Sequence, residues 1–268
     1  MDIIAQISKL LEEVRSKRTL IHHITNYVTV NDCANVVLAI GANPVMADDP
    51  NEVEDMVSIC NALVINIGTL NERTVASMIK AGKRANALNI PVILDPVGVG
   101  ATPFRFQSAK KLLEEVHFSI VRGNMAEIKV IAGLEAERAG VDSLEEEVDG
   151  VNIAKTLAQT LKSVVAITGK VDIISDGVVC YEISNGDIAL TRLTGTGCMS
   201  SSLVGSFVGA SGQPLLSTLA GIATMGIAGE MAAKASHGLG SFKIALMDSI
   251  SLLNVEQLRQ NIKIELSK

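Results

Sequence analysis

Short runs of apolar and β-branched residues alternate along the chain with longer segments in which apolar residues recur every three or four positions. The short runs predict strands and the longer segments predict helices. The expected strands are Thr19–Ile24, Pro44–Ala47, Ala62–Ile67, Pro91–Leu94, Phe118–Val121 and Val164–Thr168. The expected helices are Asn31–Ile40, Glu52–Cys60, Glu72–Leu88, Phe104–Val116, Met125–Ala132 and Glu145–Leu161. This alternation indicates an α/β protein with a largely parallel sheet that helices cover on both faces.

The pattern changes after Val171. Asp-Gly and Asn-Gly pairs, which favour tight hairpin turns, separate three further short apolar segments. These segments predict antiparallel strands at one edge of the sheet: Val171–Ser175, Val178–Ile183 and Ile188–Leu193. From Cys198 onward the pattern predicts helices throughout.

No Pro-rich or Ser-rich linker and no repeat interrupts the sequence, so we expect one domain over residues 1–268. The first 17 residues carry acids and lack a basic start, which favours an amphipathic helix over a signal peptide. The acidic stretch Glu135–Asp149 is expected to be a solvated loop and helix start. The least polar long stretch, Leu215–Ala235, holds Glu230 and Lys234 and therefore favours a buried helix over a membrane span.

Composition narrows the class of partner. Hydrophobic residues make up 48% of the chain and charged residues 19%, which predicts an apolar subunit interface. The net charge of −6 and the lack of a basic run argue against nucleic acid or an anionic membrane as the main partner. The four cysteines show neither C-x-x-C nor zinc spacing, which is typical of reduced thiols in a cytosolic protein.

Polar residues follow four of the apolar strands. Asn66, Asp95, Arg122 and Thr168 each stand at or just beyond the end of such a run. Ligands of open α/β sheets bind beyond the carboxyl ends of the strands. Each residue alone is compatible with an ordinary turn, but the four together predict a ligand crevice at this rim.

The segment Thr194-Gly195-Thr196-Gly197-Cys198 precedes an expected helix, Met199–Gly209. Glycines let backbone N–H groups approach a phosphate, and a helix start adds partial positive charge. We therefore expect Gly195, Thr196 and Gly197 to form an anion hole, although a Gly pair before a helix is also common in structural turns. The segment lacks the spacing and Lys of a Walker A loop.

Cys198 is the expected catalytic group of this segment. A helix start lowers the pKa of a thiol, and a thiolate there can accept the proton of an attacking alcohol. The alternative is a small buried hydrophobe, which is the role we assign to Cys33, Cys60 and Cys180.

Seven blocks of the sequence resemble the hydroxyethylthiazole kinase family. They follow one another in the family's order and extend over nearly the whole chain: His23–Val28, Gly41–Ala47, Asn66–Thr69, Asp95–Gly98, Arg122–Glu127, Ala166–Gly169 and Gly195–Cys198. The combination is specific, because ribokinase-like relatives commonly end the anion loop in Asp, where this chain has Cys198.

The resemblance implies a three-layer α/β/α ribokinase-like fold and the transfer of phosphate from ATP, with Mg²⁺, to 4-methyl-5-(2-hydroxyethyl)thiazole in thiamine salvage. It also implies a cytoplasmic homotrimer with active sites between subunits. The residues it assigns to the thiazole alcohol are Met46, Gly195 and Asn26. The residues it assigns to ATP are Arg122 and Thr168, and those it assigns to Mg²⁺, partly through water, are Asp95 and Glu127.

Other interpretations stay open. Asn124 and Glu127 have the spacing of a helix capping box, and Asp95 before Pro96 can simply begin a turn. Within the same fold, a kinase of hydroxymethylpyrimidine or of another small alcohol is the close alternative. A nucleotide- or thiazole-binding regulator without catalysis is the alternative from a different class.

Overall fold

The computed structural model describes residues 3–134 and 143–267. Its helices are α1 (Ile3–Lys17), α2 (Val30–Ile40), α3 (Val53–Ser58), α4 (Glu72–Ala87), α5 (Pro103–Glu115), α6 (Met125–Ile131), α7 (Ser143–Leu161), α8 (Ala189–Arg192), α9 (Thr196–Ser211), α10 (Pro214–Ala235), α11 (Leu239–Leu252) and α12 (Val255–Asn261). Its strands are β1 (Leu20–Ile24), β2 (Asn43–Met46), β3 (Ala62–Asn66), β4 (Val92–Asp95), β5 (Ile120–Asn124), β6 (Val164–Thr168), β7 (Asp172–Ser175), β8 (Cys180–Ile183) and β9 (Ile264–Leu266).

The strands form one sheet in the order β2-β1-β3-β4-β5-β6-β7-β8-β9. Neighbours from β2 to β6 pair in parallel, and β7, β8 and β9 add antiparallel strands at one edge. The register places Asn66 beside Asp95 and Asn124 beside Thr168. The predicted fold class is therefore confirmed, including the change of strand direction after β6.

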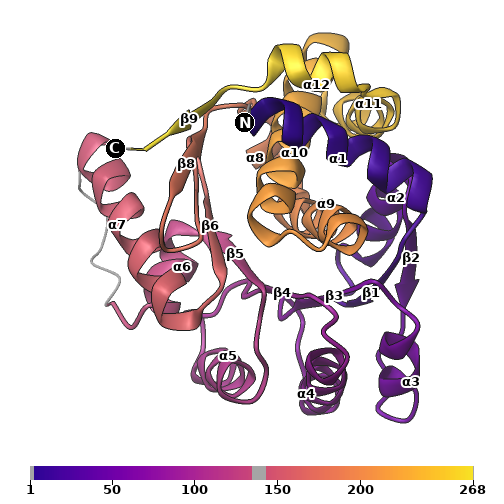
Figure 1. Cartoon of the computed structure of the whole chain (residues 1–268), viewed down its shortest axis with the longest axis vertical. Coiled ribbons are helices and arrows are strands. Elements are labelled where there is room, and N and C mark those ends of the chain that lie inside the picture. Colours follow the sequence, from indigo (N-terminus) through magenta and orange to yellow (C-terminus); the bar gives the residue numbers. More distant parts are fainter. Residues whose placement is uncertain (1–2, 135–142, 268) are drawn as a thin grey trace.

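Helices cover both faces of the sheet (Figure 1). Side chains of a strand point alternately to the two faces, and β3 shows this clearly. Val64 packs in a core with α1, α2, α9 and α10, whereas Leu63 and Ile65 pack in a second core with α3, α4, α5 and α7. A sheet that is buried on both faces explains why its strands are nearly continuous apolar runs.

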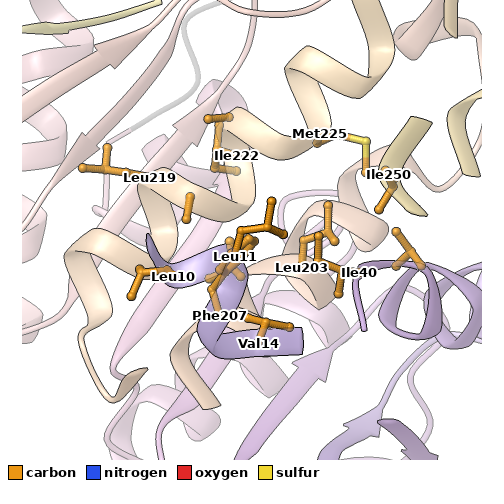
Figure 2. Close-up of a cluster of buried hydrophobic side chains, with 14 of the residues drawn as sticks. Leu10, Leu11, Val14, Ile40, Leu203, Phe207, Leu219, Ile222, Met225 and Ile250 are labelled. Carbon is orange, nitrogen blue, oxygen red and sulfur yellow. The ribbon is translucent and has the colours of Figure 1, made fainter. Parts of the chain in front are cut away.

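Helix α9 lies directly on the sheet and under α10, and most of its side chains are buried (Figure 2). Glycines make this close packing possible. A Cβ added at Gly205 would lie 2.7 Å from Cγ2 of Val64, and one added at Gly221 of α10 would lie 2.7 Å from the backbone nitrogen of Val204. The helix that begins with the predicted anion hole is thus held rigidly against the strands.

Helix α10 is long and apolar enough to cross a membrane, but 78% of its most apolar window is buried inside the fold. It packs against α9 and α11. The prediction of a buried helix over Leu215–Ala235 is confirmed.

Two predictions about elements are wrong. Residues 188–193 form no strand, because the Asp187 carboxylate accepts the Ala189 N–H at 2.8 Å and starts the short helix α8. The chain after Cys198 is not helical throughout, since β9 pairs with β8. Part of the acidic stretch, residues 135–142, lies outside the described residues, and α7 begins at Ser143.

Candidate functional site

The carboxyl ends of β3, β4, β5 and β6 bring four predicted polar residues to one rim of the sheet. Arg122 is buried in β5 and its Nη2 donates to the Thr168 hydroxyl at 2.5 Å. Its Nη1 lies 3.5 Å from Oδ1 of Asp95. Because a hydroxyl and a carboxylate hold the guanidinium from two sides, Arg122 provides a cationic group with a fixed orientation at this rim.

The loop before α9 lies against this guanidinium. Gly197 lets the two approach, because a Cβ at this position would lie 2.7 Å from Nη1 of Arg122. Gly195 has φ +88°, a left-handed conformation that favours glycine, and a Cβ there would lie 2.6 Å from Cγ2 of Thr29. Gly195 is thus required by its backbone conformation, and Gly197 by the close approach of the Arg122 guanidinium.

Cys198 lies in the first turn of α9, and 9% of its surface is exposed. Its Sγ accepts two hydrogen bonds, from Nδ2 of Asn66 at 3.3 Å and from Nδ2 of Asn26 at 3.4 Å. Burial, followed by the charge of Asp95, raises the pKa of the thiol, and the side chains of Thr29, Asn66 and Asn26 oppose this rise. The expected lowering of this pKa by the helix start is therefore wrong, because desolvation of the buried sulfur outweighs it.

Asp95 is fully buried at the end of β4. Its Oδ2 accepts hydrogen bonds from Asn66 Nδ2 at 2.8 Å and from the Ser201 hydroxyl at 3.0 Å. Its Oδ1 has no hydrogen-bond partner among the described residues and faces only the Arg122 guanidinium. Burial raises the pKa of this carboxyl, and Arg122 opposes the rise.

Glu127 and Asn124 form the predicted capping box at the start of α6. The Asn124 side chain accepts from the Glu127 N–H, and the Glu127 carboxylate accepts from the Asn124 N–H, each at 2.9 Å. The other Glu127 carboxylate oxygen accepts the Gly98 N–H at 2.9 Å, which ties α6 to the loop after β4. The carboxylate thus faces the segment that follows Asp95.

The two carboxylates fit Mg²⁺ only in part. Oxygen donors suit this ion, and Oδ1 of Asp95 is a buried oxygen without a hydrogen bond. Within residues 3–134 and 143–267, however, no three His, Cys, Asp or Glu side chains gather closely enough to hold a metal. The residues therefore fit a Mg²⁺ ion whose remaining ligands are water and phosphate oxygens.

A cavity of about 770 Å³ opens beside the loop and the guanidinium. Four of the predicted residues line it: Arg122, Thr168, Thr196 and Gly197. Apolar side chains of α8 and α10 and of the segments beside them complete its lining: Ile188, Leu190, Ile222 and Met225. A cavity that combines cationic, hydroxyl and apolar groups suits a ligand with both phosphates and an aromatic ring.

Asp172 also lines this cavity, and the sequence interpretation missed it. Its Oδ1 accepts the Gly169 N–H at 2.9 Å and so shapes the turn between β6 and β7. Burial raises the pKa of this carboxyl to about 7, and the Gly169 N–H and Arg122 oppose the rise. Its only sequence signal was its position three residues after Gly169.

The remaining predicted residues lie on the other side of Cys198. Asn26 is buried after β1, and its Oδ1 accepts from the Thr29 N–H at 3.0 Å, so that it shares Thr29 with Gly195. Met46 ends β2, the edge strand, and β1 separates it from the strands that carry Asn66 and Asp95. The structure thus gathers all the predicted residues except Met46 into one connected group.

Residues 11–256 match the model of the hydroxyethylthiazole kinase family. The chain is 54% identical to the hydroxyethylthiazole kinase of Alkaliphilus oremlandii over 99% of both chains. It is 52% identical to that of Clostridium beijerinckii over 98% of both.

Solved structures agree with these matches. The hydroxyethylthiazole kinase of Pyrococcus horikoshii superimposes with a TM-score of 0.91 and 38% identity, over 98% of this chain and 99% of the other. The pyridoxal kinase of Staphylococcus aureus gives a TM-score of 0.63 at 14% identity, over 93% of this chain and 98% of the other. This second likeness shows the ribokinase-like fold alone.

Proposed function

This chain belongs to the hydroxyethylthiazole kinase family, and on that basis we propose that it transfers the γ-phosphate of ATP to the primary alcohol of 4-methyl-5-(2-hydroxyethyl)thiazole, in thiamine salvage. The observation that carries the proposal is one cluster at the sheet's rim. It joins the Cys198 sulfur, the glycine loop at the start of α9 and the Arg122 guanidinium. These are a base, an anion hole and a cation, which phosphoryl transfer to an alcohol requires.

The cavity beside Arg122 is the proposed ATP site. Arg122 and Thr168 bind phosphate oxygens, and the backbone N–H groups of Gly195, Thr196 and Gly197 meet the phosphoryl group in transfer. The apolar lining formed by Ile222 and Met225 offers a surface for the adenine ring. The Arg122–Thr168 hydrogen bond fixes the guanidinium before ATP arrives, so little order is lost during the reaction.

Cys198 is the proposed general base. The alcohol oxygen attacks the γ-phosphorus, a new O–P bond forms, and the bond from phosphorus to the β-phosphate oxygen breaks and leaves ADP. The alcohol proton moves to the Cys198 thiolate, which becomes a thiol and later loses the proton to water. Because burial raises the pKa of this thiol, only a small part of the enzyme is ready at neutral pH, and we expect a modest rate.

Asp95 and Glu127 are the proposed holders of Mg²⁺, largely through water. When bound, the ion neutralises phosphate charge as the leaving group departs. The pairing of Asp95 with Arg122 and the hydrogen bonds that the Gly98 and Asn124 N–H groups donate to Glu127 keep both carboxylates in place without the ion.

Met46, Gly195 and Asn26 are the proposed contacts of the thiazole. The Asn26 amide already uses its hydrogen bonds on Asn66, Cys198 and Thr29. We therefore propose that Asn26 lines the thiazole pocket without donating a hydrogen bond to the ring. Gly195 offers its backbone, and Met46 a flexible apolar side chain.

We also propose a cytoplasmic homotrimer with active sites between subunits. Tyr27 and Val28 follow Asn26 directly and are 78% and 57% exposed, so that two neighbouring large side chains face solvent beside the site. A neighbouring subunit that covered them would lie beside the Asn26 amide and could complete the thiazole pocket. This position supports the interface inferred from the apolar composition.

A direct assay tests the proposed function. The protein is mixed with Mg-ATP and either the hydroxyethylthiazole or the hydroxymethylpyrimidine alcohol, and ADP and phosphorylated product are measured. Phosphorylation of the thiazole alone, or strongly preferred, is the expected result. Turnover of the pyrimidine alone would contradict the substrate assignment. Binding of both ligands without ADP formation would instead identify a regulator that has lost catalysis.

A further inference from the structure

A second amide beside Cys198, that of Asn66, was part of a family-like block but received no role from the sequence. It ends β3 and 2% of its surface is exposed. Its Nδ2 donates to Oδ2 of Asp95 at 2.8 Å and to Sγ of Cys198 at 3.3 Å. Its Oδ1 accepts from the Gly68 N–H at 2.8 Å and from Asn26 Nδ2 at 3.0 Å. All four hydrogen-bonding positions of this amide are occupied.

The backbone decides which end of each amide faces the sulfur. The Gly68 N–H can only donate, so the oxygen of Asn66 must face it and the NH₂ group must face Cys198. In the same way the Thr29 N–H holds the oxygen of Asn26, and its NH₂ group faces the sulfur as well. The backbone N–H groups of Gly68 and Thr29, which do not change protonation with pH, therefore orient two amide N–H groups toward Sγ.

The backbone that carries Asn66 is itself held in place by Arg105 of α5. Its Nη2 donates to the Gly68 carbonyl at 2.7 Å, and its Nη1 donates to the carbonyls of Ile67 at 2.7 Å and Val97 at 2.9 Å. The guanidinium joins the segments that follow β3 and β4. A shift of Asn66 that moved this segment would therefore disturb the two hydrogen bonds to Ile67 and Gly68 at once.

We propose that Asn66 is a positioning residue of the phosphoryl transfer: with Asn26, it donates to the Cys198 sulfur and directs the remaining lone pair of the thiolate toward the alcohol proton. The inference rests on the proposed base role of Cys198. A thiolate has three lone pairs, and two of them meet amide N–H groups. The Thr29 hydroxyl also lies near the sulfur, but it donates its hydrogen to Oδ1 of Asn26 at 3.0 Å, which leaves the third lone pair for the alcohol. Hydrogen bonds to an ionised acceptor are also stronger than neutral ones, so the amides hold the reactive form most firmly.

The second N–H of Asn66 has a separate effect. Together with the Ser201 hydroxyl, it occupies Oδ2 of Asp95, the carboxylate whose charge acts on the sulfur, and so competes with the thiol hydrogen for that oxygen. The other ionisable groups near the sulfur are Cys33, whose thiol faces Thr29, and Arg122, which pairs with Oδ1 of Asp95. Asn66 is thus the side chain that contacts both the sulfur and its charged neighbour.

A double-mutant cycle tests the proposal. Asn66→Leu keeps the size of the side chain and removes both N–H donors, and it is made in the wild type and in Cys198→Ala. We expect kcat to fall about tenfold or more in the wild-type background, with both KM values within about threefold. In Cys198→Ala the same change should cost less than about threefold, because Asn66 acts through the sulfur.

Equal losses in the two backgrounds would overturn the proposal, because they would show that Asn66 only supports the fold. Asn66→Ala is the second variant and carries the same cycle if the Leu variant does not fold. Asn86→Leu is the matched control: it removes an amide that exchanges two 2.8 Å hydrogen bonds with the His117 backbone, and we expect lower stability with unchanged kcat.

The outcome separates this inference from the proposed function. A wild-type protein that does not phosphorylate the thiazole contradicts the proposed function itself. An active wild type whose Cys198→Ala variant is equally active contradicts the base role and the inference together. Turnover that depends on Cys198 with additive Asn66 losses contradicts the inference alone.

Discussion

At the scale of single residues, Cys198 experiences opposing influences. The Thr29 hydroxyl and the two amide donors favour the thiolate, as does a helix start, whereas burial and the charge of Asp95 favour the thiol. Desolvation is the largest of these effects, so the pKa of the thiol is raised. The resting group is therefore a thiol.

Replacing the sulfur tests its role directly. We expect Cys198→Ala to lower kcat by about 10²-fold, as the loss of a general base often does, while substrate binding changes little. Cys198→Asp should stay active, because a carboxylate can accept the same proton. Steady-state kinetics on both variants provides the measurement. An alanine variant with the wild-type rate would remove the base role, and a folded but inactive Asp variant would count against the equivalence of the two bases.

The rate should also depend on pH in a way set by this thiol. Its pKa is raised above the ordinary value of 9.0, so the thiolate fraction grows with every step in pH from neutrality past 9. We expect kcat/KM to rise about tenfold per pH unit over that range. In Cys198→Asp the rise should occur at lower pH, because carboxyls ionise several units earlier. A flat wild-type profile between pH 7 and about 9 would contradict a thiolate base.

His23 should make the fold sensitive to acid. Its ring is buried between the Ile21 carbonyl and the Ser202 hydroxyl, and burial lowers its pKa from 6.5 to about 4. The unfolded chain therefore takes up a proton between these pH values that the folded chain does not. The free energy of unfolding should fall as the pH drops from about 6.5 to 4, by up to about 3 kcal/mol.

Denaturant titrations of the wild type and His23→Gln across this pH range measure the effect. The Asp172 carboxyl, whose pKa is raised to about 7, contributes a slope of the opposite sign, since its stabilisation is lost as the pH rises through 7. The difference between the two proteins isolates His23, because Asp172 is common to both. Parallel curves would show that the histidine is not buried neutral.

The sequence predicted which residues reach the rim but not what they contact there. Arg122, Thr168 and Cys198 were found because they follow strands or begin a helix. Asn66 had the same signal, a polar residue at the end of an apolar run, yet its role depends on Cys198, which lies 132 positions along the chain. The pKa of Cys198 was misjudged for the same reason, since local position indicates the helix start but not the burial.

At the scale of elements, α9 connects the hydrophobic core to the proposed base and anion hole. Its first turn carries Thr196, Gly197 and Cys198, and its later turns lie on β1 and β3. Gly205 and Gly209 bring the helix close, because a Cβ at either would lie within 3 Å of a methyl group of Val64 or Ile21. Any force that lifts the helix from the sheet also moves the base and the anion hole.

Gly205→Ala tests this coupling. The new methyl would lie 2.7 Å from Val64, and we expect a loss of about 1–3 kcal/mol in the free energy of unfolding, together with a lower kcat. Gly240→Ala on α11 is the matched control: no atom lies within 4 Å of its added Cβ, so stability and rate should stay unchanged. Thermal unfolding and steady-state assays distinguish the two. Full activity in a destabilised Gly205 variant would contradict the coupling.

The elements that the sequence misjudged are short. Residues 188–193 form a short, mostly apolar segment after an Asn-Gly pair, as a hairpin strand does, but the Asp187 carboxylate accepts the Ala189 N–H where α8 begins. Strand β9 has three residues and exists only because β8 offers it an edge. Longer elements such as α4 were predicted within a residue or two, since their periodic patterns extend over several turns.

At the scale of the whole molecule, several large apolar side chains lie on the surface of the single subunit and contribute nothing to its core. Tyr27, Val28 and Leu38 lie on or just before α2, and Ile244 lies on the neighbouring helix α11; each is at least half exposed. Lys243 and Asp32 join these two helices through an ion pair of 2.6 Å. A second subunit packed here would cover these side chains and lie next to the site.

We expect the native protein in solution to have about three times the 28.2 kDa mass of one chain. Tyr27→Asp should dissociate it and lower thiazole turnover, because the side chain is 78% exposed in the single subunit and supports no core. Val178→Asp is the matched control, with 84% exposure in the turn between β7 and β8. Analytical ultracentrifugation measures the mass of each variant in solution, and activity assays measure its thiazole turnover. A fully active monomer would contradict sites shared between subunits.

The rim groups come from six separate stretches of chain, from Asn26 to Cys198; five of them lie at the ends of different parallel strands, and the sixth is the start of α9. Such a sheet is dominated by pairings between distant residues, which makes folding slow relative to helix formation. Enzymatic activity should therefore recover late during refolding, after most of the secondary structure has formed. After dilution from denaturant, helical circular dichroism should return first, and enzymatic competence only once β1 through β6 have all found their neighbours.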